Sequence, residues 1–231
     1  MFTLYPYQEL GSADHGWLNA RHHFSFASYR NPKRTGFGNL LVINDDIILG
    51  QSGFATHPHD NMEIITYVRK GAITHKDSMG NVGKTSAGDV QVMSAGSGVR
   101  HSEYNLEQQE TKLYQIWIRP NKFNVEPRWE AKEFPKEAIA EQLSLLVSGD
   151  IADKESGALF IYQDAKIYGG KIKQGTTIKQ PIKDKAYILA SLGSLEINNN
   201  KMHEGDGAEI VDENLLTINT VTDAEILVIV V

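Results

Sequence analysis

The stretch that decides the fold is residues 53–105, GFATHPHDNMEIITYVRKGAITHKDSMGNVGKTSAGDVQVMSAGSGVRHSEYN. It contains one His-Pro-His pattern and one His-Ser-Glu pattern. Side chains two residues apart on a β-strand point to the same face. His57 and His59 can therefore face one point, and so can His101 and Glu103. If the two strands face each other inside a small barrel, three imidazoles and one carboxylate converge.

Three imidazoles and one carboxylate suit a single divalent transition metal ion, and imidazole favours Fe, Cu, Ni or Zn. Four protein ligands on an ion that accepts six leave room for substrate or dioxygen. One His-x-His pattern alone is a weak signal and is often a solvated turn. Here, however, the run Ser94–Gly98 is a clear turn signal before the second pattern. Valine and aromatic residues surround both patterns, as strands require.

Several runs of the sequence together resemble the two cupin motifs and, more closely, the pirins and the pirin-like quercetinases. The matching runs are HHFSFASY (22–29), THPHDNMEIITYV (56–68), THKDSMGN (74–81), SAGSGVRHSEYN (94–105) and LYQIWI (113–118). The resemblance extends from about residue 16 to residue 120 and continues more weakly through the second half. It implies that the metal ligands are His57, His59, His101 and Glu103. It leaves out Glu63, which general cupins often use as a ligand.

The resemblance also implies an activity of the quercetin 2,3-dioxygenase type. In this reaction dioxygen cleaves a flavonol such as quercetin and carbon monoxide is released. Glu103 would be the catalytic base that removes the proton of the 3-hydroxyl group. We expect one divalent transition metal per chain, with Fe first and Cu, Ni, Mn or Zn as alternatives. The expected partners are a flavonol-like aromatic molecule and dioxygen.

The aromatic residues near the motifs allow two interpretations. They can form the wall of an apolar substrate pocket, or they can be ordinary core, which we favour for most of them. They are Phe24, Phe26, Phe37, Phe54 and Tyr104.

Two other functions are compatible with the same site. The resemblance to pirins also implies a non-catalytic, redox-responsive metal module that regulates a protein partner. A phosphosugar isomerase would need cationic residues facing the metal, but alternation sends Arg100 to the opposite face from His101. Metal content measured together with aerobic quercetin turnover separates the dioxygenase from the non-catalytic module.

Composition narrows the class of protein. A chain of 231 residues with 41% hydrophobic residues can form one large or two small domains. There is no apolar run of membrane-spanning length and no signal-peptide pattern, so we expect a cytoplasmic protein, and a monomer. Without cysteines, any metal must be held by His, Asp or Glu. A net charge of −6 without a basic stripe argues against direct nucleic-acid binding.

The spacing of strand and turn signals predicts an all-β bicupin, with two antiparallel β-barrel (jelly-roll) domains in one chain. We expect an N-terminal metal-binding domain over 1–120 and a connector over 121–142, with a brief helix at 136–142. The second cupin, over 143–231, would lack metal ligands because His203 is its only histidine.

Other residues near the motifs have simpler expected roles. His22 and His23 are adjacent and cannot both face one metal, so we expect them to pack and hydrogen-bond near the site. His75 lies between a strand and a turn, which suggests a surface hydrogen bond. Pro58 has no backbone donor and belongs on an edge strand.

Overall fold

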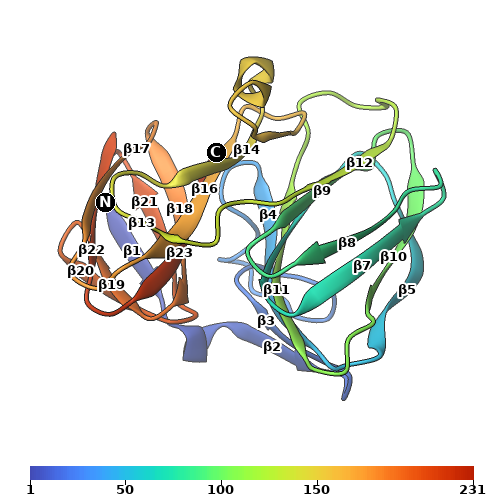
Figure 1. Cartoon of the computed structure of the whole chain (residues 1–231), viewed down its shortest axis with the longest axis horizontal. Coiled ribbons are helices and arrows are strands. Elements are labelled where there is room, and N and C mark those ends of the chain that lie inside the picture. Colours follow the sequence, from blue (N-terminus) through green and yellow to red (C-terminus); the bar gives the residue numbers. More distant parts are fainter. The chain divides into compact units, whose positions relative to one another are not determined.

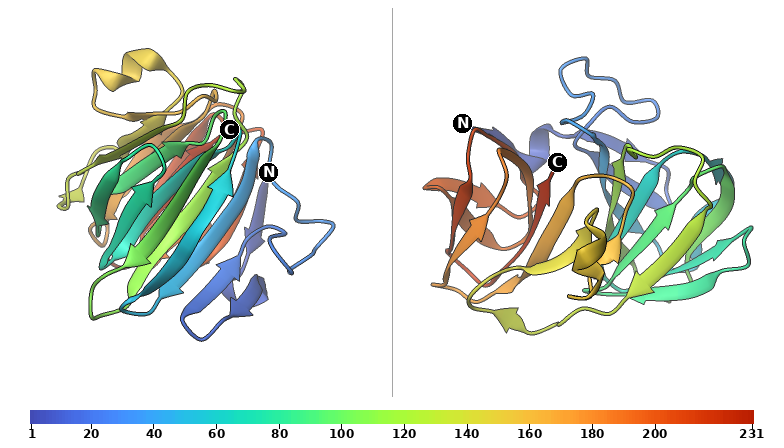
Figure 2. Two further views of the ribbon diagram at one scale, coloured as in Figure 1. Left: turned by 90° about the vertical axis from the view of Figure 1, so that its right-hand side faces the viewer. Right: turned by 90° about the horizontal axis from the view of Figure 1, so that it is seen from above.

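The computed structural model describes all residues, Met1–Val231, and they form β-strands with two short 3-10 turns at Tyr7–Glu9 and Ile151–Lys154. The chain divides into two compact units (Figures 1 and 2). The first unit comprises residues 11–134 and 159–164, and the second comprises residues 1–10, 135–158 and 165–231. None of the helical segments has the length and apolarity needed to cross a membrane.

The first unit contains a small sheet and a large sheet, both antiparallel. The small sheet has the order β5-β10-β7-β8, and its strands lie side by side in Figure 1. The large sheet has the order β12-β9-β6-β11-β4-β3-β2. The strands of this unit are β2 (Gly11–Asp14), β3 (Leu18–His22), β4 (Leu40–Ile48), β5 (Ser52–His59), β6 (Glu63–Lys70), β7 (Ala72–Asp77), β8 (Val82–Ser86), β9 (Val90–Ser94), β10 (Val99–Asn105), β11 (Thr111–Ile118), β12 (Arg128–Lys132) and β15 (Leu159–Phe160).

Residue type explains why these segments pair as strands. β6, β9 and β11 are rich in β-branched and aromatic residues, which fit a pleated, buried surface. Gly71 joins β6 to β7 with a φ of +74°, and a Cβ there would lie 2.7 Å from Thr111 Oγ1, so a residue with a side chain would be strained and crowded. Apolar side chains such as Ile64, Met93 and Val99 pack together in the interior.

The second unit also combines a larger and a smaller sheet. The larger has the order β1-β21-β18-β23-β16-β14, with β13 parallel to β16, and the smaller has the order β17-β22-β19-β20. Its core is a large apolar cluster that includes Ile188, Leu216 and Ile226. The strands are β1 (Phe2–Tyr5), β13 (Ala138–Ile139), β14 (Ser144–Ser148), β16 (Lys166–Ile172), β17 (Thr177–Pro181), β18 (Lys185–Leu192), β19 (Ser194–Ile197), β20 (Asn200–His203), β21 (Gly207–Val211), β22 (Leu215–Thr220) and β23 (Ala224–Val230).

The all-β prediction is confirmed, with paired sheets in place of continuous closed barrels. The brief helix expected at 136–142 is wrong, because this segment is extended and Ala138–Ile139 pairs with β16. Ile139 packs against the core cluster of the second unit, and this contact outweighs helix propensity.

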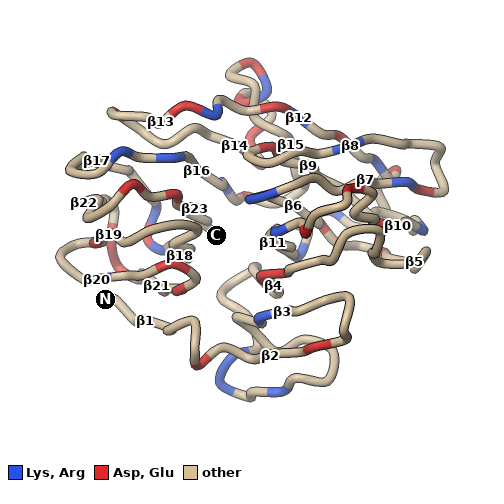
Figure 3. Tube along the Cα trace, turned by 60° about the horizontal axis from the view of Figure 1, so that its bottom comes forward, with Lys and Arg blue, Asp and Glu red and all other residues tan.

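Figure 3 shows Lys and Arg interspersed with Asp and Glu along the chain.

Candidate metal centre

Two neighbouring strands of the small sheet, β5 and β10, carry the four candidate ligands. In the β5–β10 ladder, His101 lies directly opposite His57, and Val99 lies opposite His59. Along β10 buried and less buried residues alternate, and both His101 and Glu103 are buried. The predicted shared face of His101 and Glu103 agrees with this alternation. Pro58 is on β5, which is the edge strand of the sheet, as expected.

The three imidazoles converge on a small volume. One ring nitrogen each from His57, His59 and His101 lies within 4.8 Å of the others. The Nε2 atoms of His57 and His101 are 3.1 Å apart. His57 Nδ1 lies 2.7 Å from the carbonyl oxygen of Ala55, which only accepts, so Nδ1 carries the proton and Nε2 carries the lone pair. This donor set fits a divalent transition metal ion.

The electrostatics of the cluster favour the neutral form of His59 and His101. Burial, with the neighbouring His57, lowers the pKa of His59 to about 4. Burial lowers the pKa of His101 to about 3, and His57, His59 and His75 contribute further. Neutral imidazoles have a free lone pair, which is the form that binds metals.

Glu103 is buried at 1% exposure and is held by side chains of the large sheet. Its Oε1 accepts hydrogen bonds from Gln91 Nε2 at 2.5 Å and Thr66 Oγ1 at 3.2 Å. Its Oε2 accepts from Gln115 Nε2 at 2.8 Å. Burial raises the pKa of Glu103 to about 7, although these three donors pull it down. A carboxylate has about four lone-pair positions, so one position on Oε2 stays available.

The residues that hold Glu103 form one row across the large sheet. Gln91 lies opposite Thr66, and Gln115 lies opposite Thr66 on the other side. The row continues through Asn44 to His22, whose Nδ1 lies 2.7 Å from Asn44 Oδ1. These polar side chains are all buried.

Glu103 lies deeper than the three-histidine group. It belongs to a second group with His75 and His101, again with ligand atoms within 4.8 Å of one another. The structure therefore brings the three predicted histidines together and places the predicted carboxylate behind His101. Glu63 belongs to neither group, since its Oε2 accepts from Ser94 Oγ at 2.7 Å. The assignment of the four ligands stays a prediction.

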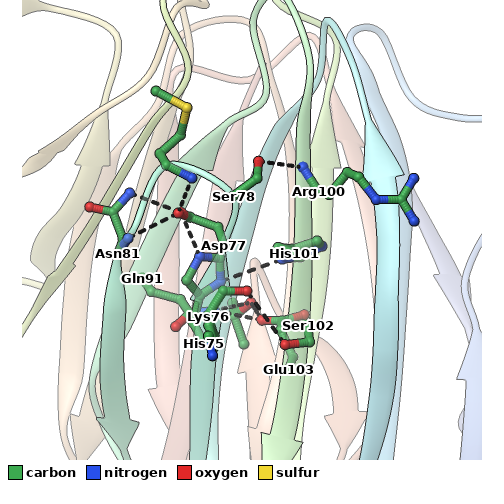
Figure 4. A network of polar contacts seen from close by, with 12 residues as sticks. His75, Lys76, Asp77, Ser78, Asn81, Gln91, Arg100, His101, Ser102 and Glu103 are labelled. Carbon is green, nitrogen blue, oxygen red and sulfur yellow. Dashed lines mark hydrogen bonds and ion pairs between the residues drawn. The ribbon is translucent and has the colours of Figure 1, made fainter.

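His75 differs from its expected surface role. It is fully buried, its ring stacks on Trp129 with centroids 4.9 Å apart, and its Nδ1 lies 3.4 Å from His101 Nδ1. The expectation of a surface hydrogen bond is wrong because β7 extends to Asp77, so that His75 lies within the strand and faces the interior. Figure 4 shows His75 between Asp77 and His101.

Aromatic side chains flank the histidines. Trp117 packs edge-on against His59 with centroids 4.9 Å apart, and Phe26 packs against Trp117 at 5.4 Å. Trp117 Nε1 is buried and has no hydrogen-bond partner. Phe54 lies 6.5 Å from His57, whereas Phe24 is core, as favoured from the sequence.

Sequence reasoning missed Gln91, Gln115 and Trp117 as parts of this site. A signal for the two glutamines was present, because each interrupts an otherwise apolar strand, VQVM on β9 and LYQIWI on β11. A buried polar residue requires a partner. His23 is buried and lies outside both ligand groups.

The fold and the donor set define a protein of the cupin class. A family model described as Pirin matches residues 5–118, and one described as Quercetinase C-terminal cupin domain matches residues 145–231. A pirin-like protein of Caulobacter vibrioides is 49% identical over 226 residues, which is 97% of both chains. The chain belongs to the pirin family.

Other relatives cover nearly the whole chain as well. An Escherichia coli K12 protein named quercetin 2,3-dioxygenase is 42% identical, with 98% of this chain and 97% of that protein covered. The crystal structure of YhhW from Escherichia coli matches with a TM-score of 0.92 at 40% identity, and the match covers 99% of this chain and 97% of YhhW. The crystal structure of the bacterial pirin YhhW from Escherichia coli in complex with nickel(II) matches with a TM-score of 0.91 at 39% identity. This match covers 99% of this chain and 98% of that chain.

Proposed function

We propose that this chain is a metal-dependent dioxygenase that cleaves flavonols such as quercetin and releases carbon monoxide. Its ligands for one divalent transition metal per chain, iron in first place, are His57, His59, His101 and Glu103. The observation that carries the proposal is the convergence of three imidazoles beside a buried carboxylate. The relatives named quercetin 2,3-dioxygenase and the nickel(II) complex of a bacterial pirin support it.

The residues around the cluster can perform the protein's part of the reaction. A bound divalent metal would supply a Lewis acid for the flavonol oxygens and a route for electrons to dioxygen. Glu103 is a carboxylate beside the histidine cluster and could accept the 3-hydroxyl proton. Trp117 and Phe26 give an apolar wall on which an aromatic ring system can pack.

The hydrogen bonds of Glu103 restrict how it takes part. With three of its four lone-pair positions filled by Gln91, Thr66 and Gln115, one position on Oε2 remains. That position can hold the metal or a proton, but not both at once. We therefore infer that Oε2 of Glu103 is the oxygen that would hold the metal, and that the same oxygen is the one able to accept the substrate proton.

The test is Glu103→Gln, with metal content and aerobic quercetin turnover measured on the same preparation. The amide keeps the shape and a carbonyl oxygen but loses the charge and most of the basicity. We expect metal to remain at least partly bound while turnover per metal falls by about 10²-fold or more, the scale of general base catalysis.

Other outcomes of this experiment would indicate a different role for Glu103 or a different function for the protein. Metal and turnover that fall together, with an unchanged rate per bound metal, would make Glu103 a ligand only. Full metal and full turnover would remove Glu103 from the site. Stoichiometric metal in the unaltered protein without any quercetin turnover would contradict the dioxygenase and favour the non-catalytic module.

A further inference from the structure

Asp77 is a buried acceptor at the end of β7. Its side chain is 1% exposed. Its Oδ1 accepts from the backbone N–H groups of Met79 at 2.9 Å and Asn81 at 3.0 Å, and its Oδ2 accepts from Asn81 Nδ2 at 2.9 Å. These three donors fix the carboxylate in one orientation, which Figure 4 shows. The fourth contact of the carboxylate, Oδ2 to His75 Nε2, is 3.0 Å long.

This arrangement sets the direction of a chain of hydrogen bonds. An ionised carboxylate only accepts, so His75 Nε2 must donate to Asp77. In a neutral imidazole the other nitrogen then carries the lone pair, and His75 Nδ1 faces His101 Nδ1 at 3.4 Å. His101 Nδ1 therefore donates, and its Nε2 is left with the lone pair.

The lone pair on His101 Nε2 points into the three-histidine group. His57 Nε2, 3.1 Å away, also carries a lone pair because His57 Nδ1 donates to Ala55 O. Two lone pairs at this distance repel unless a cation lies between them. The two chains of hydrogen bonds, which start at Ala55 and at Asp77, thus prepare both nitrogens for the same ion.

The ring of His75 is held in place from its face as well. It is nearly parallel to the indole of Trp129, with an interplanar angle of 9°. Trp129 in turn lies over Gly83, the cross-strand neighbour of His75, where a Cβ would be 2.2 Å from Trp129 Cη2. The stacking leaves the imidazole little freedom to rotate.

We propose that His75, held by Asp77 and Trp129, is a positioning residue that keeps His101 in its Nδ1–H tautomer with Nε2 free for the metal. This inference rests on the proposed metal site. An acceptor for the second nitrogen of a ligating histidine fixes the tautomer and the ring orientation, and its loss typically lowers metal affinity 10–100-fold.

The test uses the full chain, Ni(II) as the probe, and two readouts. The first is the tautomer of His101 in the metal-free protein, read from ring ¹⁵N chemical shifts, and the second is Ni(II) affinity by competition with a chelator. His75→Phe keeps a flat ring against Trp129 but removes the acceptor. His75→Asn keeps an acceptor near the position of Nδ1. Met79→Ala, on the same turn and with an exposed side chain outside the hydrogen-bond chain, is the matched control.

We expect His75→Phe to lose the Nδ1–H signature of His101 and to bind Ni(II) about 10–100-fold more weakly. His75→Asn should restore much of both, and Met79→Ala should resemble the unaltered protein. Asp77→Asn is a second way to remove the Nδ1–H tautomer of His101. The NH₂ group of the new asparagine can donate to His75 Nε2, which reverses the tautomers of His75 and His101. This variant should show His101 protonated on Nε2 and a similar loss of affinity.

Three results would overturn the inference in different ways. Unchanged Ni(II) affinity and an unchanged His101 tautomer in folded His75→Phe would show that the acceptor is unnecessary. Two Ni(II) per chain in the unaltered protein, falling to one in His75→Phe, would make His75 a ligand of a second ion. No Ni(II) binding by the unaltered protein would contradict the proposed metal site itself.

Discussion

Glu63 and Glu103 are two buried carboxyl groups with the same pKa, about 7, in different surroundings. Burial raises both. Glu103 accepts from two glutamine amides and a threonine, whereas Glu63 has Ser94 Oγ and a backbone N–H of Tyr162 as donors and lies outside both ligand groups. Glu63 therefore has a measurable effect on stability that is separate from metal binding.

The raised pKa of Glu63 predicts that the free energy of unfolding depends on pH. Its reference pKa is 4.5, so between about pH 4.5 and about pH 7 the folded chain binds more protons at this site than the unfolded chain. The free energy of unfolding should therefore fall as pH rises through this range. Glu63→Gln, which stays neutral, should gain up to about 3 kcal/mol relative to the unaltered protein between about pH 5 and about pH 8.

Urea unfolding of metal-free protein at both pH values measures this difference. Glu126→Gln, on an exposed carboxyl group, is the control for the loss of one charge. A difference between Glu63→Gln and the unaltered protein that stays constant with pH would mean that Glu63 titrates alike in the folded and unfolded chains.

At the scale of strands, the alternation of side chains between the two faces of a β-strand was enough to predict part of the site. It placed His101 and Glu103 on one face of β10 and sent Arg100 to the other, and the burial pattern of β10 agrees. Pro58 was correctly expected on an edge strand. These features depend only on local geometry.

The other parts of the site depend on pairing between distant strands. The row Gln91–Thr66–Gln115 forms only because β9, β6 and β11 are adjacent and in one register. His75 reaches His101 only because β7 pairs with β10. Neither strand order nor register follows from the residues of a single strand, so these contacts could not be predicted from the sequence.

Gly53 gives a prediction that belongs to the β5–β10 pair. A Cβ at this position would lie 2.3 Å from the backbone oxygen of Glu103 and 2.6 Å from Tyr104 Cα. These are backbone atoms, so Gly53→Ala has to separate β5 from β10 close to the bulge between His101 and Glu103. Because His57 and His59 are on β5 and His101 is on β10, we expect Ni(II) affinity to fall by about tenfold or more, the scale given for disturbing the support of metal ligands.

Isothermal titration with Ni(II), with far-ultraviolet circular dichroism to verify the strand content, tests this prediction. Ser52→Ala, the neighbouring position on β5, is the control because it adds no atom against β10. Unchanged Ni(II) affinity in Gly53→Ala would show that the close approach of the two strands does not set the ligand geometry.

At the scale of the whole molecule, the two units have the same sheet plan but different interiors. The first unit contains the polar row and both ligand groups. The second has a large apolar cluster in its interior, and its only histidine, His203, is exposed. From the sequence we expected only that the second half lacks metal ligands, since it has no His-x-His pattern, and the polar row of the first unit was not expected.

This contrast predicts one metal ion per chain, bound in the first unit. Native mass spectrometry after addition of Ni(II) should show one bound ion, and His59→Ala should lose most of it because one of three converging imidazoles is removed. His203→Ala is the matched control, since it removes the one histidine of the second unit, whose Nδ1 lies 3.8 Å from Asp206 Oδ2. Loss of the ion in His203→Ala, with the strand content unchanged, would place the metal in the second unit and contradict the assignment of the site to β5 and β10.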